Sequence, residues 1–271
     1  MSEKLNKNYA IGVFDSGLGG LTVVKELIRQ LPHEHIVYFG DTARVPYGTK
    51  SKESILRFSK ENTKLLLRYH VKAIVVACNT SSSIAVAALR KQFSVPIIDV
   101  IYPGARKAVG VTKNKTIGVI ATQATIASQA YTKRVKGISP RVRVIAQACP
   151  LFVPLAEEGW FDHSVSLAVA QMYLKPLKAK NIDTLILGCT HYPLLASVIQ
   201  KTMGPKVHLI DSAKEVALEV EKLLVQKDLM RSLATKGRHL FLVSDEPDHF
   251  QILARRFLGR AIKNVKRVPH V

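Results

Sequence analysis

Short runs of β-branched and aliphatic residues alternate with amphipathic stretches along almost the whole chain. Strands that alternate with helices in this way are typical of parallel sheets built from βαβ units. The apolar runs predict strands at residues 10–14, 36–39, 73–77, 97–100, 116–120, 142–146, 184–188, 207–210 and 239–243. Apolar residues at helical spacing predict helices at 21–30, 51–69, 82–91, 102–109, 125–135, 164–179, 194–201, 213–226 and 248–258.

Three predicted strand ends recur in the same order, which indicates an internal repeat. Ile11-Gly12-Val13 returns as Ile117-Gly118-Val119, Cys78 as Cys189, and Asp99 as Asp211. We therefore expect an α/β protein with two pseudo-symmetric parallel-sheet domains and an active site in the cleft between them. The expected first domain is residues 1–101 plus 213–271, and the second is residues 102–212.

Two of the predicted strands run into a cysteine that is followed by small polar residues, at Cys78 and Cys189. Ligands of open α/β sheets bind beyond the carboxyl ends of strands, so both thiols are expected at the site. Loop N–H groups and helix N-termini lower the pKa of a thiol, and His191 could hold a proton beside Cys189. Two thiols on opposite sides of one substrate suit an enzyme that moves a proton from one face of a carbon to the other. Cys149 is expected to be an inert buried thiol.

A glycine-rich turn, residues 14–20, follows the first predicted strand and opens a helix. Its N–H groups could bind a carboxylate or phosphate. A dinucleotide fingerprint would need glycine at Thr22, and the ending of a P-loop is missing. Asp15 is a candidate general base or thiol activator, or alternatively a helix N-cap. Beyond the next strand, Tyr47 and Gly48 could pack against a ligand or form an ordinary turn.

Acidic residues and histidines elsewhere leave alternatives open. Residues 150–159 are expected to place Glu157 and Glu158 at the start of a helical stretch, where carboxylates complement the helix dipole. His33 and His35 flank Glu34 in an expected surface loop, where a metal site is not expected.

Length and composition exclude several classes of protein. The chain has 271 residues, enough for two domains. Its beginning lacks the apolar core of a signal peptide, and no apolar run approaches the roughly 18 residues of a membrane span. Three widely spaced cysteines do not form a disulfide framework, so a reducing cytoplasm is expected.

The net charge of +20 attracts anions, including nucleic acid. No nucleic-acid-binding motif is recognisable. Solvated helix faces and a nucleic-acid partner both remain possible explanations of the charge.

Five motifs in order resemble glutamate racemases, the cofactor-independent amino-acid racemases of peptidoglycan synthesis. The resemblance extends from about Tyr9 to Gly259, and its motifs are residues 14–20, 40–48, 77–80, 149–154 and 188–193. It implies an isomerase that interconverts L- and D-glutamate without pyridoxal phosphate or metal. It also implies that Cys78 takes the α-proton of the D-enantiomer and Cys189 that of the L-enantiomer.

The resemblance assigns further roles around the two thiols. Asp15 would assist Cys78 and His191 would assist Cys189, and the family's site glutamate falls at Glu157 in preference to Glu158. The implied substrate-binding residues are Asp15, Ser16, Tyr47, Gly48, Asn79, Thr80, Thr190 and His191. Members of the family are often homodimers, and some relatives inhibit DNA gyrase.

Other functions remain as alternatives. An aspartate racemase or an arylmalonate-type decarboxylase would share the fold, although the decarboxylase type keeps only one of the two cysteines. Cys189 with His191 could instead form a hydrolase pair with an acyl-enzyme step, which would leave Cys78 unexplained.

Overall fold

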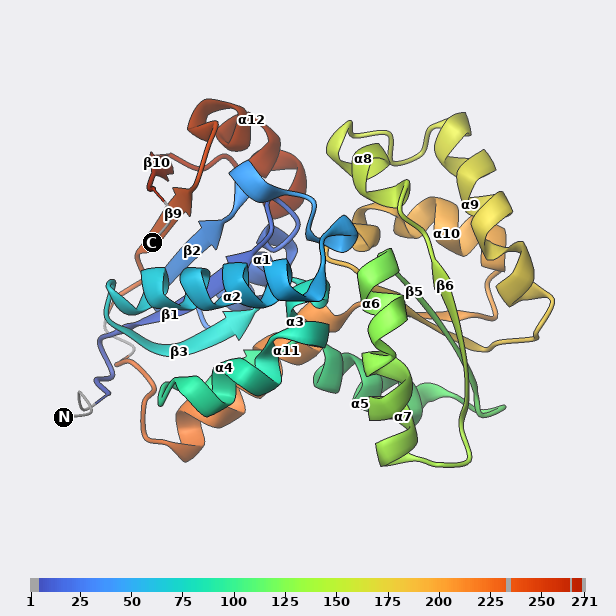
Figure 1. Ribbon diagram of the computed structural model, residues 1–271, viewed down its shortest axis with the longest axis horizontal. Helices are drawn as coiled ribbons and strands as arrows, with labels where there is room; N and C mark the ends of the chain where they lie inside the picture. The colour runs from blue at the N-terminus through green and yellow to red at the C-terminus, as the bar shows by residue number, and fades with distance from the viewer. Residues whose placement is uncertain (1–4, 233–234, 264, 270–271) are drawn as a thin grey trace.

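Two parallel β-sheets flanked by helices lie side by side in the computed structural model, which describes residues 5–232, 235–263 and 265–269 (Figure 1). Within these residues, the first sheet has six strands in the order β10-β9-β2-β1-β3-β4, and the second has four in the order β6-β5-β7-β8. The strands are β1 (Ala10–Asp15), β2 (Ile36–Gly40), β3 (Val71–Val76), β4 (Ile97–Asp99), β5 (Thr116–Ala121), β6 (Arg143–Ala148), β7 (Thr184–Gly188), β8 (His208–Ile210), β9 (His239–Val243) and β10 (Val265–Arg267).

Helices connect successive strands and cover the faces of the sheets, as βαβ units require. The α-helices are α1 (Leu21–Gln30), α2 (Lys52–Leu67), α3 (Asn79–Ile84), α4 (Val86–Gln92), α5 (Ile101–Val111), α6 (Gln123–Ser128), α7 (Ala130–Ile138), α8 (Phe152–Glu157), α9 (Ser164–Lys178), α10 (Ala196–Met203), α11 (Ser212–Gln226) and α12 (Pro247–Leu258). Short 3₁₀ helices are η1 (Thr42–Arg44), η2 (Tyr47–Thr49) and η3 (Tyr192–Leu195). Among the described residues, no helix has both the length and the apolar character that crossing a membrane requires.

The predicted fold class is confirmed, and the repeat is visible in the topology. Strands β2-β1-β3-β4 of the first sheet and β6-β5-β7-β8 of the second follow the same order relative to the chain. Gly12 in β1 pairs with residues of β2 and β3, as Gly118 in β5 pairs with residues of β6 and β7. Cys78 and Cys189 therefore follow corresponding strands of the two units.

Some predicted elements differ from the structure. The helix expected at 82–91 begins earlier and is divided at Ala85 into α3 and α4. The helix expected at 125–135 is divided at Gln129, whose φ of 57° interrupts the helical hydrogen bonds. Strand β10 was not expected, because only three residues of it pair with β9 at the edge of the sheet.

Helix α11 connects the cores of the two sheets. Its buried face, which includes Val216 and Val220, belongs to one hydrophobic cluster that contains Val13 of β1 and Val119 of β5. Because α11 packs chiefly against α1, and β9 then pairs with β2, the chain returns to the first sheet after β8. On this basis we propose the domain boundaries 1–101 plus 213–271 and 102–212.

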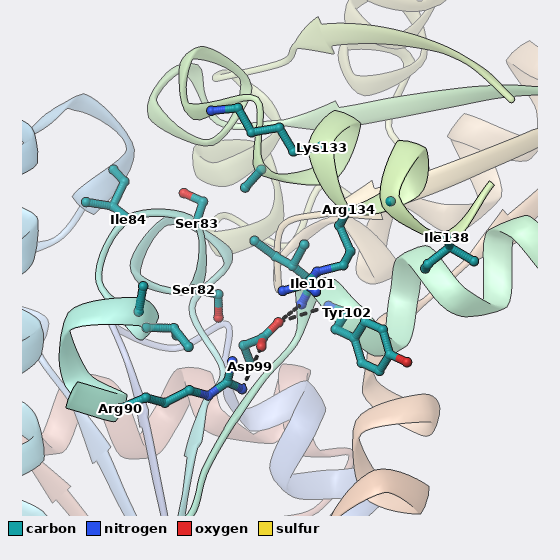
Figure 2. Close-up of a pocket in the computed structure, with 14 residues that line it drawn as sticks. Ser82, Ser83, Ile84, Arg90, Asp99, Ile101, Tyr102, Lys133, Arg134 and Ile138 are labelled. Atoms are coloured by element: carbon teal, nitrogen blue, oxygen red, sulfur yellow. Dashed lines mark hydrogen bonds and ion pairs between the residues drawn. The ribbon is translucent and has the colours of Figure 1, made fainter. Parts of the chain in front are cut away.

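The first crossing between the sheets is fixed by Asp99 at the end of β4. Its Oδ1 accepts hydrogen bonds from the N–H groups of Ile101 and Tyr102, each at 2.9 Å, and its Oδ2 lies 2.9 Å from Arg90 Nη2 (Figure 2). A carboxylate at this position satisfies free N–H groups and complements the dipole at the start of α5. The cavity of about 610 Å³ shown in Figure 2 also has Lys133 and Arg134 of α7 in its lining.

Candidate active site

Two buried cysteines lie beyond the carboxyl ends of corresponding strands. Cys78 follows β3 and Cys189 follows β7, and both are free thiols. Negative charge at Cys189 contributes to the raised pKa of Cys78, so the two thiols lie within electrostatic reach of each other. Each sheet thus contributes one buried cysteine beyond the carboxyl end of one of its strands.

The glycine-rich turn after β1 packs directly against the segment that follows Cys189. The Thr22 hydroxyl donates a hydrogen bond to the Thr190 carbonyl oxygen at 3.2 Å. A Cβ atom at Gly19 would lie 2.1 Å from Thr190 Oγ1 and 2.6 Å from His191 Nδ1. Only a residue without a side chain permits this approach, so glycine at position 19 has a steric reason beyond the turn itself.

Asp15, at the end of β1, is buried in this turn. Its Oδ2 accepts hydrogen bonds from the N–H groups of Gly17 at 3.2 Å and Gly20 at 2.9 Å. Its Oδ1 is buried with no hydrogen-bond partner among the described residues. Burial raises the pKa of Asp15, although the charge of His191 and the N–H groups lower it. Gly20, not Asp15, is the N-cap residue of α1, so the alternative of Asp15 as the helix N-cap is wrong.

Cys78 does not have the acidic thiol that its position at the start of α3 predicted. Burial, followed by the negative charge of Asp15, raises the pKa of Cys78 to about 12. Hydrogen bonds to Ser81 lower the pKa but do not offset these two effects. Desolvation outweighs the helix N-terminus here, and Cys78 is a neutral thiol near pH 7.

Cys189 has different neighbours, which form a chain of polar contacts. Its Sγ lies 3.8 Å from His191 Nδ1, and His191 Nε2 lies 3.0 Å from Glu157 Oε1. Burial lowers the pKa of His191, but the hydrogen bonds to Cys189 and Glu157 and the charges of both groups raise it to about 10. A protonated imidazole beside the sulfur stabilises a negative charge on it. The Phe257 ring contacts the His191 ring edge-to-face, with 5.4 Å between the centroids.

Glu157 lies at the end of a helix, not at its start. It is the last residue of α8, and Glu158 is the C-cap residue. The predicted charge complementarity at a helix N-terminus is therefore wrong. At the C-terminal end, a carboxylate lies beside the negative end of the helix dipole, which is unfavourable. Two contacts offset this unfavourable interaction: His191 lies beside the Glu157 carboxylate, and Arg256 donates a hydrogen bond to the Glu157 carbonyl oxygen at 2.7 Å. Of the two adjacent acids, Glu157 is the one that contacts His191.

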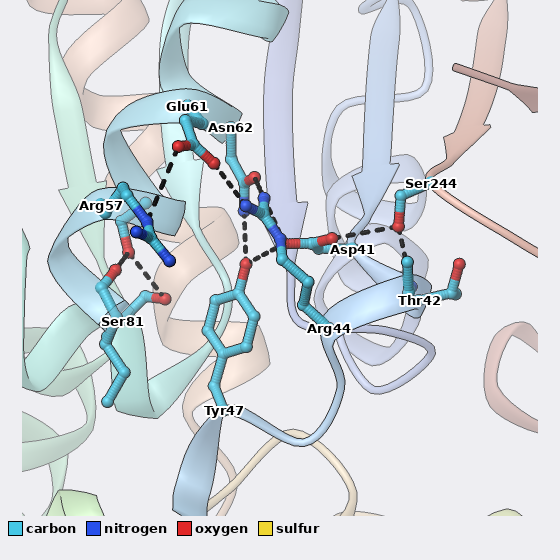
Figure 3. Close-up of polar contacts among 12 residues, drawn as sticks. Asp41, Thr42, Arg44, Tyr47, Arg57, Glu61, Asn62, Ser81 and Ser244 are labelled. Carbon is cyan, nitrogen blue, oxygen red and sulfur yellow. Dashed lines mark hydrogen bonds and ion pairs between the residues drawn. The ribbon is translucent and has the colours of Figure 1, made fainter. Parts of the chain in front are cut away.

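A polar network fixes the segment that contains Tyr47 and Gly48 (Figure 3). The Tyr47 hydroxyl donates to Asp41 Oδ2 and accepts from Asn62 Nδ2 at 3.0 Å, while Arg44 binds Asp41. The Tyr47 ring is buried in a cluster with Phe58 and Cys78. This arrangement occupies the hydroxyl of Tyr47 and fixes the position of its ring.

Hydroxyl and amide groups from both sheets meet beside Gly48. A Cβ atom at Gly48 would lie 2.7 Å from Thr122 Cβ. Thr80 Oγ1 lies 2.9 Å from Thr122 Oγ1 and 3.3 Å from Thr125 Oγ1. The Tyr131 hydroxyl donates to Asn79 Oδ1 at 2.7 Å.

The sequence reasoning missed Thr122, Thr125 and Tyr131. The internal repeat could have identified Thr122. Ser16 follows β1 as Thr122 follows β5, with the same offset of 106 residues that separates Ile11 from Ile117. Ser16 itself is buried in the turn after β1.

A sequence profile of the Asp/Glu/hydantoin racemase family matches residues 11–220. The chain belongs to this family. As a racemase it is an isomerase. It is 51% identical to the glutamate racemase of Geobacter metallireducens, over 96% of each chain, and 48% identical to that of Syntrophus aciditrophicus, over 97% of this chain and 99% of the relative.

Solved structures support the same relationship. The Bacillus anthracis glutamate racemase RacE1 matches with a TM-score of 0.94 at 42% identity, over 97% of this racemase and 98% of the other chain. The Francisella tularensis glutamate racemase, solved in complex with D-glutamate, matches with a TM-score of 0.91 at 40% identity over the same shares. The Picrophilus torridus aspartate racemase matches 79% of this chain and 94% of its own with a TM-score of 0.58, but at 19% identity this shows the fold alone.

Other expectations concern residues of this racemase away from the two thiols. Within the described part of the chain, no three His, Cys, Asp or Glu side chains are grouped to hold a metal ion. The expectation that Glu34 lies on the surface is wrong. Its side chain is buried, and its Oε2 lies 2.5 Å from Lys72 Nζ. Cys149 is buried, and burial raises the pKa of its thiol, which agrees with an inert residue.

Proposed function

We propose that this chain interconverts L- and D-glutamate by a two-base mechanism with Cys78 and Cys189 as the bases. The observation that carries the proposal is the pair of buried thiols with opposite surroundings. Cys78 lies beside the carboxylate of Asp15, and Cys189 lies 3.8 Å from a histidine whose pKa is raised to about 10. One thiol and one thiolate at a single site are what proton abstraction and return on opposite faces of a carbon require.

The relatives support glutamate as the substrate. Those that match the chain at 46–51% identity over nearly the whole length are named glutamate racemases, and one structural neighbour holds D-glutamate. Asp15, Ser16, Tyr47, Gly48, Asn79, Thr80, Thr190 and His191 are proposed to hold the amino and carboxylate groups of the substrate.

The proposed reaction transfers one proton at each thiol. With L-glutamate, the thiolate of Cys189 takes the proton from Cα, and the electron pair remains on the substrate as a carbanion delocalised into the carboxylate. The thiol of Cys78 then donates its proton to the opposite face, which leaves D-glutamate, a Cys189 thiol and a Cys78 thiolate. The reverse reaction starts from that protonation state. Neither step requires a cofactor or a metal ion.

Burial serves this chemistry in two ways. The α-proton beside a carboxylate is weakly acidic, so the developing charge needs fixed dipoles in a site without water. Both sulfurs must also be held in line with the Cα–H bond, on opposite faces. The direct packing of the Gly19 turn against Thr190 and His191 supports such a fixed arrangement.

The wider role is proposed from the resemblance. D-glutamate is a component of peptidoglycan, so the enzyme would supply cell-wall synthesis and thereby cell shape. A cytoplasmic location and a homodimer are expected on the same ground. A nucleic-acid or gyrase partner for the charge of +20 has no further observation in its favour.

The deciding experiment follows deuterium incorporation at Cα. Reduced, metal-free protein without added cofactor is incubated in D₂O with L-glutamate or L-aspartate, and the products are analysed by NMR and chiral chromatography. Deuterated D-glutamate, and no D-aspartate, is expected. Substitutions Cys78→Ser and Cys189→Ser are each expected to abolish racemisation. A hydrolase based on Cys189 would instead keep its activity in Cys78→Ser, and no exchange with either amino acid in the wild type would refute the proposal.

A further inference from the structure

Helix α12 reaches from the first sheet to the polar chain behind Cys189. The helix packs against α1 and the β9–β10 edge of the first sheet, whereas α8 lies beside η3 and α9 on the second. Figure 1 shows α12 and α8 facing each other across the top of the molecule. Two consecutive residues of α12, Arg256 and Phe257, contact the other side.

The contact of Arg256 is directed at the main chain of Glu157. Its Nη1 donates to the Glu157 carbonyl oxygen at 2.7 Å. The last carbonyl groups of a helix have no partner within the helix, and a guanidinium is a favourable partner beside the negative end of the dipole. Gly159, with φ of 78°, lets the chain turn under Arg256, because a Cβ there would lie 3.1 Å from the guanidinium carbon.

Phe257 extends the same contact to the next group in the chain. It is buried, and its ring meets the His191 ring at 86°. His191 is thereby bounded by α12 and the Gly19 turn from the first sheet, and by Cys189 and Glu157 from the second.

We infer that Arg256 is a positioning residue for one of the two bases. It holds the end of α8 so that the Glu157 carboxylate stays 3.0 Å from His191, and His191 in turn supports the thiolate of Cys189. Among the described residues, the Arg256 side chain forms no hydrogen bond or ion pair with Asp15 or Cys78. The inference rests on the proposed two-base function and predicts an effect on the Cys189 half-reaction alone.

A one-sided defect must be measured through isotope effects. The equilibrium constant between enantiomers is one, so kcat/KM has the same value in both directions for every variant. The deuterium effect on kcat/KM differs, because Cys189 breaks the labelled bond of L-[2-²H]glutamate and Cys78 breaks that of D-[2-²H]glutamate. When the Cys189 step is slowed, it becomes more rate-limiting with the labelled L-enantiomer and the Cys78 step becomes less so with the labelled D-enantiomer.

The experiment compares Arg256→Met with Arg256→Lys and with Arg255→Met. Arg255 is a suitable control because it is exposed on the same helix and its side chain has no hydrogen bond or ion pair within the described residues. Loss of one hydrogen bond from a charged donor is expected to lower kcat/KM of Arg256→Met about 2- to 10-fold. Its isotope effect should rise with the L-enantiomer and fall with the D-enantiomer. Arg256→Lys, which keeps a cationic donor, should restore the wild-type isotope effects, and Arg255→Met should retain them.

Several results would overturn the inference. Isotope effects in Arg256→Met that equal those of Arg255→Met would show that Arg256 positions nothing. An equal change for both enantiomers would assign Arg256 to general closure of the site. Thermal unfolding of each variant identifies a folding defect, in which case Arg256→Gln replaces Arg256→Met. Absence of racemisation by the wild type would instead refute the proposed function.

Discussion

A single methyl group at Gly19 is expected to disable the site while the protein still folds. In Gly19→Ala, the new Cβ would lie 2.1 Å from Thr190 Oγ1 and 2.6 Å from His191 Nδ1. Favourable contacts between heavy atoms lie near ~3.5–4.0 Å, so atoms on one side must move by about 1 Å or more. Either Thr190 and His191 rotate away from Cys189, or the turn and the second sheet separate.

The size of the effect follows from the accuracy that the reaction demands. A displacement of about 1 Å of a positioned group can reduce the rate about 100-fold. Excess volume in a packed region costs about 1–3 kcal/mol of unfolding free energy, which leaves a stable domain folded. We therefore expect Gly19→Ala to lose about 100-fold in kcat/KM with a modest fall in Tm.

Racemase activity from both enantiomers and thermal unfolding test this expectation together. Gly110→Ala is the matched control, because nothing lies within 4 Å of a Cβ at Gly110 and the residue is in helix α5. This control should keep full activity and gain about 0.5–1 kcal/mol in stability, since alanine is the better helix former. Wild-type activity in Gly19→Ala would refute the reasoning that this turn must touch the segment after Cys189.

Three further predictions concern charged groups. In Glu157→Gln, His191 loses the partner that helps raise its pKa to about 10, so with L-glutamate the alkaline limb of the kcat profile should move to lower pH; an unchanged profile would contradict this. Lys72→Met leaves the buried Glu34 carboxylate without its cationic partner, with only the Arg231 N–H still donating to it, and urea unfolding should show a loss of about 3–5 kcal/mol, partly recovered by adding Glu34→Gln. Burial and the charge of Arg260 lower the pKa of His239 to about 4 from its ordinary 6.5. The unfolded state therefore binds the proton first on acidification, and Tm should fall as pH decreases from 6.5 toward 4, less steeply in His239→Asn.

The sequence was sufficient for features that depend on local pattern. Apolar runs of four or five residues identified the strands, because parallel strands covered on both faces contain few polar residues. The repeat placed Cys78 and Cys189 after corresponding strands, and parallel sheets collect their strand ends at one edge. Both cysteines are buried there.

Features that depend on contacts distant in sequence were missed or wrongly predicted. The raised pKa of Cys78 comes from burial and from Asp15, 63 residues away in the chain, whereas the local pattern contained only a helix start. Tyr131 reaches Asn79 across 52 residues, and Arg256 reaches Glu157 across 99. No local periodicity encodes such contacts, because they arise only when the two sheets are packed together.

The two halves of the site show why a repeated fold suits a reaction between mirror images. Duplication of the unit β2-β1-β3-β4 as β6-β5-β7-β8 places a thiol at the same position in each half. Identical surroundings would give the two thiols the same affinity for one shared proton, so the repeated geometry alone would favour neither protonation arrangement. The two halves differ in charge where they agree in geometry. Burial and the carboxylate of Asp15 raise the pKa of Cys78, whereas Cys189 has as its neighbour His191, whose pKa is raised by its contacts with Cys189 and Glu157. If this difference sets which thiol is protonated in the free enzyme, removing the negative charge of Asp15 or the positive charge of His191 should change which enantiomer of glutamate the free enzyme accepts first.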